Sequence, residues 1–231
     1  MTEFRPSRFQ ILPTIIKNLL IINVLVFLAQ VTIGQAIKLE DTFALHTWQS
    51  PLFKPWQFLT HMFMHGGWDH LFFNMFALWM FGSILENVWG PKRFLTFYLI
   101  CGLGAALCHM IVLYFNTQNL IEAYNSLSLM EQQGYEERFY RHLNEPTLGA
   151  SGAIFGCLAA FGYLFPNTYI YLYFFFPIKA KWFVILYAGF ELVMAVQNTA
   201  GDNVAHVAHL GGALAGFLMV YFWNKNKKRF Y

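Results

Sequence analysis

A serine and a histidine stand among glycines near the starts of two apolar segments. The serine run is Gly149-Ala150-Ser151-Gly152-Ala153-Ile154-Phe155-Gly156, and the histidine run is Ala208-His209-Leu210-Gly211-Gly212-Ala213-Leu214-Ala215-Gly216. A serine hydroxyl becomes a strong nucleophile only when a base removes its proton, and a neutral imidazole can act as that base. Because both segments are apolar enough for a membrane, the pair predicts hydrolysis by a serine nucleophile inside a bilayer.

The composition is that of a membrane protein with several spans. Hydrophobic residues make up 57% of the 231 residues and charged residues 12%, whereas soluble domains are nearer about one half and one quarter. At about 20 residues per span, the length leaves room for six or seven helices. The first apolar run is full length and has no small-residue cleavage site after it, so we expect a permanent span.

Six spans are expected, joined by two long outer loops. We place the spans at about Leu12–Ile33, Trp68–Val88, Phe94–Tyr114, Leu148–Phe165, Lys181–Gln197 and Val204–Trp223. The first outer loop, 34–67, is rich in aromatic residues and should lie at the membrane interface. The third loop of the chain, 116–147, is also an outer loop; it is the most polar stretch and should contain a short amphipathic helix. The apolar run Tyr169–Phe176 is too short to span, so we interpret it as a connection or the foot of the fifth span.

The distribution of Lys and Arg predicts the orientation. One side, with both termini, carries eleven basic residues: Arg5, Arg8, Lys17, Lys92, Arg93, Lys179, Lys181, Lys225, Lys227, Lys228 and Arg229. The other side carries four: Lys38, Lys54, Arg138 and Arg141. The positive-inside rule then places residues 1–11 and the basic tail 224–231 in the cytoplasm, on either side of one bundle domain, 12–223, which includes the polar loop 116–147. The net charge of +3 requires no nucleic-acid partner.

This topology brings four polar side chains to one depth. The second, fourth and sixth spans run in the same direction, so their starts, with His70, Asn74, Ser151 and His209, meet at the outer level. His70 and Asn74 are four residues apart and share a helix face. An imidazole N–H and an amide NH₂ can donate hydrogen bonds to a developing oxyanion. The same two side chains can instead form hydrogen bonds that hold neighbouring helices together.

Glycines are expected to bring the serine and histidine segments close together. They share one face of each segment and are Gly149, Gly152 and Gly156 on the first, and Gly212 and Gly216 on the second. Small residues at this spacing let helix backbones approach closely. The glycines beside the serine also leave backbone N–H groups open at the helix start, where the positive end of the dipole favours an oxyanion.

Four further side chains could contact or assist Ser151 and His209. Phe155, one turn below Ser151, is placed to pack against the histidine ring or against lipid. His206 is a rival base without the glycine pattern. No carboxylate is evidently placed to complete a triad, since Asp69 and Asp202 look like helix-start residues. The sequence therefore predicts a Ser–His dyad without an essential acid.

Three motifs together resemble the rhomboid family of intramembrane serine proteases, bacterial type. They are Gly-Ala-Ser-Gly (149–152), Ala-His-x-x-Gly-x-x-x-Gly (208–216), and His70-Leu71-Phe72-Phe73-Asn74 preceded by His61 and His65; Glu86 and Gly90 also fit. The resemblance covers about Pro51–Trp223. The chain departs from it at Trp56-Gln57, where the family often has Trp-Arg, and at Phe155, where a Tyr is common. The acidic third loop, 116–147, is also longer than in the simplest members.

The resemblance implies a six-helix bundle with a water-filled cavity that opens to the outer side of a bacterial inner membrane. Ser151 would be the nucleophile and His209 the base, and the oxyanion hole would consist of His70, Asn74 and the Ser151 backbone amide. The substrates would be transmembrane helices in contact with membrane lipids. The fifth span and the loop Asn198–Asn203 would form a lateral gate and a cap, and no cofactor or metal is expected.

Two alternatives stay open at this point. One is a catalytically silent relative that binds membrane helices without cutting them. The other is a metal-dependent membrane enzyme or transporter, because His61/His65 and His206/His209 have plausible ligand spacing. No His-Glu-x-x-His run is present in the sequence, which disfavours the metal hypothesis.

Overall fold

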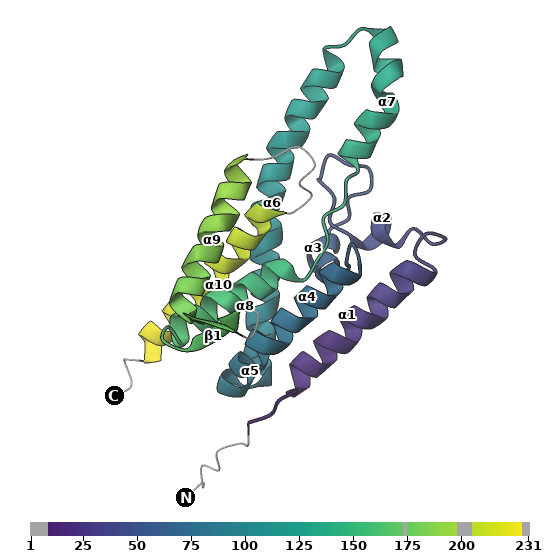
Figure 1. Ribbon diagram of the computed structural model, residues 1–231. Coiled ribbons are helices and arrows are strands. Elements are labelled where there is room, and N and C mark those ends of the chain that lie inside the picture. The colour runs from purple at the N-terminus through teal and green to yellow at the C-terminus, as the bar shows by residue number, and fades with distance from the viewer. Residues whose placement is uncertain (1–8, 173–174, 198–204, 228–231) are drawn as a thin grey trace, which may run out of the picture.

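Apolar helices that run between the two ends of the molecule dominate the architecture (Figure 1). The computed structural model describes residues 9–172, 175–197 and 205–227. Five helical rods within them are long and apolar enough to span a membrane. They are α1 (Thr14–Thr32), the rod of α4 (Trp68–Ala77), π-helical turn η2 (Leu78–Gly82) and α5 (Ser83–Trp89), then α6 (Pro91–Asn125), α9 (Ala180–Gln197) and α10 (His206–Lys227).

The sixth apolar helix of the described part, α8 (Ser151–Leu164), has only 14 residues, fewer than the about 20 that cross a bilayer core. The expected all-α membrane bundle is confirmed, while the count of six spans stays a prediction. The start of α1 and the end of α10 lie at the same end of the bundle (Figure 1).

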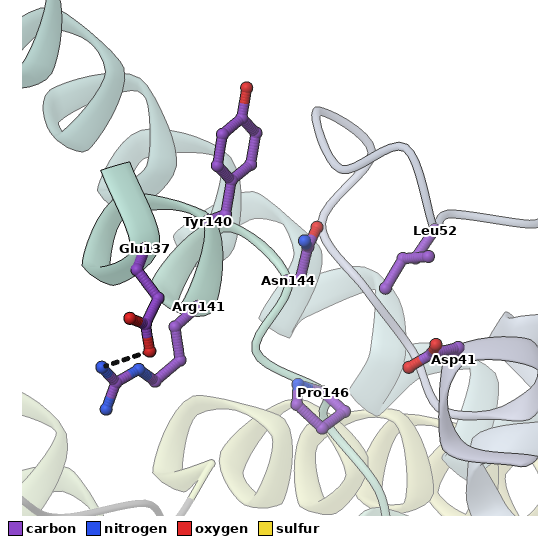
Figure 2. A pocket seen from close by; sticks show the side chains of 7 residues that line it. All are labelled: Asp41, Leu52, Glu137, Tyr140, Arg141, Asn144 and Pro146. Carbon is purple, nitrogen blue, oxygen red and sulfur yellow. Dashed lines mark ion pairs between the residues drawn. The ribbon is translucent and has the colours of Figure 1, made fainter. Parts of the chain in front are cut away.

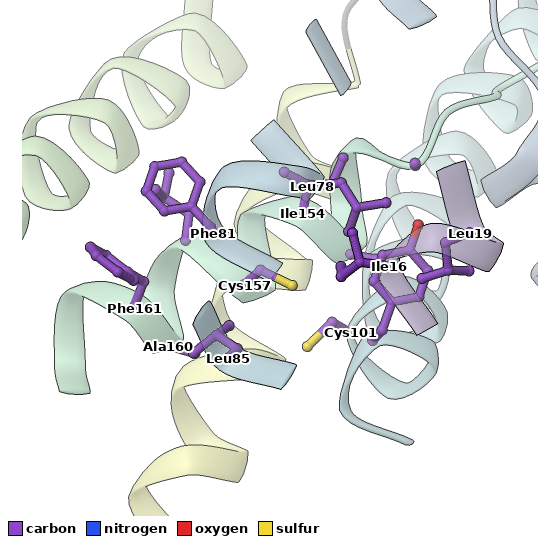
Figure 3. Close-up of a cluster of buried hydrophobic side chains, with 14 of the residues drawn as sticks. Ile16, Leu19, Leu78, Phe81, Leu85, Cys101, Ile154, Cys157, Ala160 and Phe161 are labelled. Atoms are coloured by element: carbon purple, nitrogen blue, oxygen red, sulfur yellow. The ribbon is translucent and has the colours of Figure 1, made fainter. Parts of the chain in front are cut away.

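Helices α6, α8 and α10 pack together at the centre, and α1 and α9 flank them (Figure 1). Figure 3 shows the core, where Cys101 of α6 and Cys157 of α8 lie among buried aliphatic and aromatic side chains. Both thiols are fully buried and free, as small apolar residues of a core would be. The close packing around α8 holds this short helix at a defined depth.

Helix α1 is attached to the bundle by a buried glutamate. The Glu86 carboxylate of α5 accepts the backbone N–H groups of Ile15 and Ile16, both at 2.9 Å. These amides belong to the first turn of α1 and have no partner inside their own helix. Glu86 therefore serves as an N-terminal cap supplied by another helix.

The first outer loop is organised around Gln57. The loop contains α2 (Leu39–Phe43), α3 (Gln57–Thr60) and the 3₁₀ turn η1 (His61–Phe63). The amide oxygen of Gln57 accepts the backbone N–H groups of His46 and Lys54, and its nitrogen lies within hydrogen-bonding distance of three carbonyls, of which Leu52 is nearest at 2.9 Å. A fully buried neutral amide thus anchors the loop where the family pattern often has Arg.

The third loop, 116–147, is more helical than expected. Helix α6 continues to Asn125, through the first part of the predicted loop, because no Pro or Gly interrupts it there. Its 35 residues measure about 50 Å, more than the about 30 Å of a bilayer core. The predicted amphipathic helix is α7 (Leu129–Leu143), which a capping box of Ser128 and Glu131 begins. A pocket of about 600 Å³ lies between α7 and the first outer loop (Figure 2).

The run Tyr169–Phe176 contributes to two paired β-strands, so of its two interpretations the connection is confirmed and the foot of the fifth span is wrong. Strand β1 (Tyr169–Leu172) pairs antiparallel with β2 (Phe176–Lys179). Pro177 at the start of β2 cannot donate a helical hydrogen bond, and the aromatic and β-branched residues suit a strand. The two strands belong to the connection from α8 to α9.

Candidate active site

The segment before α8 is held in place by three hydrogen-bonded contacts. Thr147 exchanges two backbone hydrogen bonds of 2.8 Å with Leu45, and its hydroxyl lies 3.0 Å from Nε2 of His109. The backbone N–H of Gly149 then donates to the carbonyl of His61 at 2.9 Å. Gly149 has φ of +133°, a conformation that glycine adopts more readily than other residues. These contacts fix the position of the chain just before α8, which begins at Ser151.

The structure brings Ser151 and His209 into direct contact. Ser151 Oγ lies 2.8 Å from Nε2 of His209, which is in the first turn of α10. The glycines make the approach possible, because a Cβ on Gly216 would lie 2.6 Å from the carbonyl oxygen of Gly156. At Gly212 a Cβ would overlap the carbonyl of Gly152. The expected glycine-to-glycine packing of these two helices is therefore present.

An aromatic ring lies flat against the histidine. The ring of Phe155 is parallel to that of His209 within 7°, with the centroids 4.2 Å apart. Tyr187 of α9 packs on Phe155, with centroids 5.0 Å apart. Phe155 thus occupies the position that the sequence pattern predicted, and it restricts rotation of the imidazole.

Glu191 of α9 lies at the site, although its spacing in the sequence did not predict it. Its Oε2 atom lies 2.9 Å from Nδ1 of His209 and 2.6 Å from Nδ1 of His206. The expectation that no carboxylate lies beside the pair is therefore wrong. Glu191 is the one Asp, Glu, Lys or Arg residue between Trp182 and Gln197 in an otherwise apolar helix, and an isolated charge in a span is a signal for function that could have found it. Asp202 lies outside the described residues.

His70 and Asn74 lie at the start of α4, as expected. The backbone N–H of Gly66 donates to Nδ1 of His70 at 3.3 Å, so the ring proton is on Nε2. That edge of the ring faces Gly149. A Cβ atom built on Gly149 would lie 2.9 Å from Nε2 of His70 and 3.6 Å from Ser151 Oγ. The buried Nδ2 of Asn74 has no hydrogen-bond partner among the described residues. His70 therefore has a donor available near the start of α8, and Asn74 has an unpaired buried donor.

Two more histidines beside the site are neutral at physiological pH. Burial lowers the pKa of His61 and that of His65 to about 4 in each case. His65 packs edge-on against His70, with ring centroids 5.2 Å apart, and its backbone is held by Gln30 of α1, whose Oε1 accepts its N–H at 2.9 Å. These contacts support the entry of the chain into α4.

Among the described residues, one cluster of three could hold a metal ion. Glu191, His206 and His209 have ligand atoms within 4.8 Å of one another. The carboxylate already lies at hydrogen-bonding distance from both imidazoles, and Nε2 of His209 faces a serine rather than an open ligand position. This arrangement fits a hydrogen-bonded cluster better than a catalytic metal, which keeps an open position.

Comparison with known families agrees with this geometry. Residues 52–226 match the family model of the Rhomboid domain. The chain belongs to the rhomboid family. It is thus an integral multi-pass membrane protein of a family of intramembrane proteases, and the resemblance in the three motifs is confirmed.

Curated rhomboid proteins are about 30% identical to the chain over the segments that align. Rhomboid protein 1, mitochondrial, of Saccharomyces cerevisiae is 31% identical over 163 residues, which cover 71% of this chain and 40% of the relative. Rhomboid protease GluP of Bacillus subtilis is 30% identical over 70% of this chain and 25% of the relative. Putative rhomboid protease YdcA of the same species is 29% identical over 76% of this chain and 71% of the relative. The chain therefore spans less than half of the first two relatives.

Proposed function

We propose that this rhomboid protein is an active serine endopeptidase that cleaves transmembrane segments of other membrane proteins. The hydrogen bond between Ser151 Oγ and His209 Nε2, at 2.8 Å, is the observation that carries the proposal. A catalytic base must lie within about 2.6–3.2 Å of the proton that it removes. A catalytically silent relative needs no such pair.

The reaction would proceed by acyl transfer. His209 takes the Ser151 proton as Oγ attacks the substrate carbonyl carbon, and the carbonyl oxygen becomes an anion. The resulting imidazolium gives its proton to the leaving amine, and water then hydrolyses the acyl-enzyme by the same steps in reverse.

The donors around α8 suit the oxyanion. The Ser151 backbone N–H belongs to the first turn of the helix and has no intrahelical partner. His70 presents Nε2–H, and Asn74 has an unpaired amide nitrogen. Such donors stabilise charge that develops only in the transition state. We assign the oxyanion hole to these three groups.

The basic-residue asymmetry supports a site that opens to the side opposite the termini. The bacterial inner membrane, as the resemblance implied, is part of the proposal. Substrate would enter laterally past α9, whose large apolar side chains, such as Ile185, Leu186 and Val196, are mostly exposed. The predicted cap, Asn198–Asn203, lies outside the described residues.

Cleavage of a single-span model substrate in liposomes tests the proposal. The wild type should cut it, and Ser151→Ala and His209→Ala should not, because each removes one reacting group. Ser83→Ala, which changes another buried serine in α5, should cut like the wild type. Equal cleavage by wild type and Ser151→Ala would refute the proposal. Specific binding of the substrate without cleavage by any of the proteins would favour the silent scaffold instead.

A further inference from the structure

We propose that Glu191 is a positioning residue that orients His209 and stabilises its protonated form, so that this protein works with a Ser–His–Glu arrangement. The inference rests on the proposed function, since it concerns the same base. It departs from the dyad that the sequence predicted. Its basis is the contact of Glu191 Oε2 with Nδ1 of His209 at 2.9 Å.

The contact decides which imidazole nitrogen carries the proton. A carboxylate at Nδ1 only accepts hydrogen bonds, so the neutral ring holds its proton on Nδ1 and presents a lone pair at Nε2. That lone pair faces the Ser151 hydroxyl at 2.8 Å. When Nε2 takes the serine proton, the ring becomes a cation 2.9 Å from the carboxylate oxygen. An anion at this distance stabilises the imidazolium that forms in the reaction.

The carboxylate is itself held in one place. His206 Nδ1 lies 2.6 Å from the same Oε2 atom, and the Glu191 residue is only 2% exposed. A buried carboxylate is costly unless it is hydrogen-bonded, and two imidazole donors provide those bonds. His206 thus has a role that its sequence position did not reveal, as a support for Glu191 rather than as a rival base.

Other titratable groups near the base come from three more elements. They are His70 on α4, His109 on α6 and Tyr187 on α9, and His206 is one turn away on α10. None of the three histidines carries a negative charge in any protonation state. Glu191 is therefore the group whose removal should change the charge balance around His209 most.

Kinetics of three variants over a range of pH test the inference. Glu191→Gln should lower kcat by about 100-fold or more, because the amide can turn its NH₂ group toward Nδ1, and this donor favours the imidazole tautomer that cannot accept the serine proton at Nε2. Its residual activity should persist to lower pH than that of the wild type, because the protonated imidazole has lost its anion. Glu191→Asp should recover part of the rate. Glu86→Gln replaces another buried glutamate and should lower the thermal midpoint without moving the pH profile.

The outcomes separate this inference from the proposed function. An active wild type with Glu191→Gln unchanged in kcat and pH profile would overturn the role of Glu191 and leave the serine mechanism standing. If Glu191→Gln does not fold, Glu191→Asp tests the inference instead. The Asp carboxylate is one methylene further from His209, so kcat should fall at least several-fold. Wild-type kinetics in Glu191→Asp would then overturn the inference. Loss of wild-type activity on treatment with EDTA would also overturn it, because the cluster would then hold a metal.

Discussion

Replacement of Gly212 by alanine should separate the two helices that carry Ser151 and His209. A Cβ at this position would overlap the backbone carbonyl of Gly152, the residue after the serine. Neither backbone can give way without moving its helix. The same change at Gly216 places the Cβ 2.6 Å from the Gly156 carbonyl oxygen, where ordinary contact begins at 3.4 Å. Gly216→Ala therefore requires a movement of most of an ångström, and Gly212→Ala requires more.

The expected losses follow from that movement. Overpacking costs about 1–3 kcal/mol, and a misplacement of about 1 Å in a catalytic group costs about 100-fold in rate. Gly212→Ala should therefore lower both the thermal midpoint in detergent and kcat in liposomes, and Gly216→Ala should do so less. Gly189→Ala on α9, where an added Cβ meets nothing within 4 Å, is the matched control and should change neither. Wild-type kcat and stability in Gly212→Ala would refute the packing argument.

Three further predictions concern single groups. Asn74→Ala should lower kcat by about 10–1000-fold in the liposome assay if its free amide is an oxyanion donor, and an unchanged rate would remove it from the hole. Glu86→Gln should lower the thermal midpoint, because it weakens two charge-assisted bonds to α1 that are worth about 1.5–3 kcal/mol each; an unchanged midpoint would contradict that capping role. The pKa of His61 and that of His65 are about 4 in the folded protein, against 6.5 as the ordinary value. The unfolded chain therefore binds more protons as the pH falls from 6.5 to 4, so folding stability should fall by up to about 2 kcal/mol for each histidine between pH 7 and pH 5. Thermal unfolding of the wild type and His65→Gln should show a weaker pH dependence in the variant, and equal dependence would contradict the neutral, buried state.

The sequence was enough to predict that Ser151, His209 and Phe155 lie together. Equal depth of the second, fourth and sixth spans followed from their order and direction, and glycine spacing indicated which faces approach. The contact of Ser151 with His209, and that of Phe155 with the same ring, are as those patterns indicated. Such patterns succeed because helix periodicity and bilayer thickness restrict where a residue can lie.

The features that were missed depend on tertiary contacts. Glu191 joins the site because α9 turns the face with this residue inward while many of its large apolar side chains stay exposed, and spacing alone did not relate it to residues of α10. Gln57 anchors the first outer loop through backbone groups 3 to 16 residues earlier in the same loop, and the irregular path of the loop is not given by a helix or strand period. Helix α6 continues through a polar stretch because helix propensity, rather than membrane thickness, decides where it ends.

Mapping the adduct of a fluorophosphonate probe tests the central claim most directly, because the probe reacts with a serine that a base has activated. Mass spectrometry of the labelled wild type should locate the adduct on Ser151. His209→Ala should abolish labelling, and His206→Ala should retain most of it. An adduct on another residue, or full labelling of Ser151 in His209→Ala, would contradict the account.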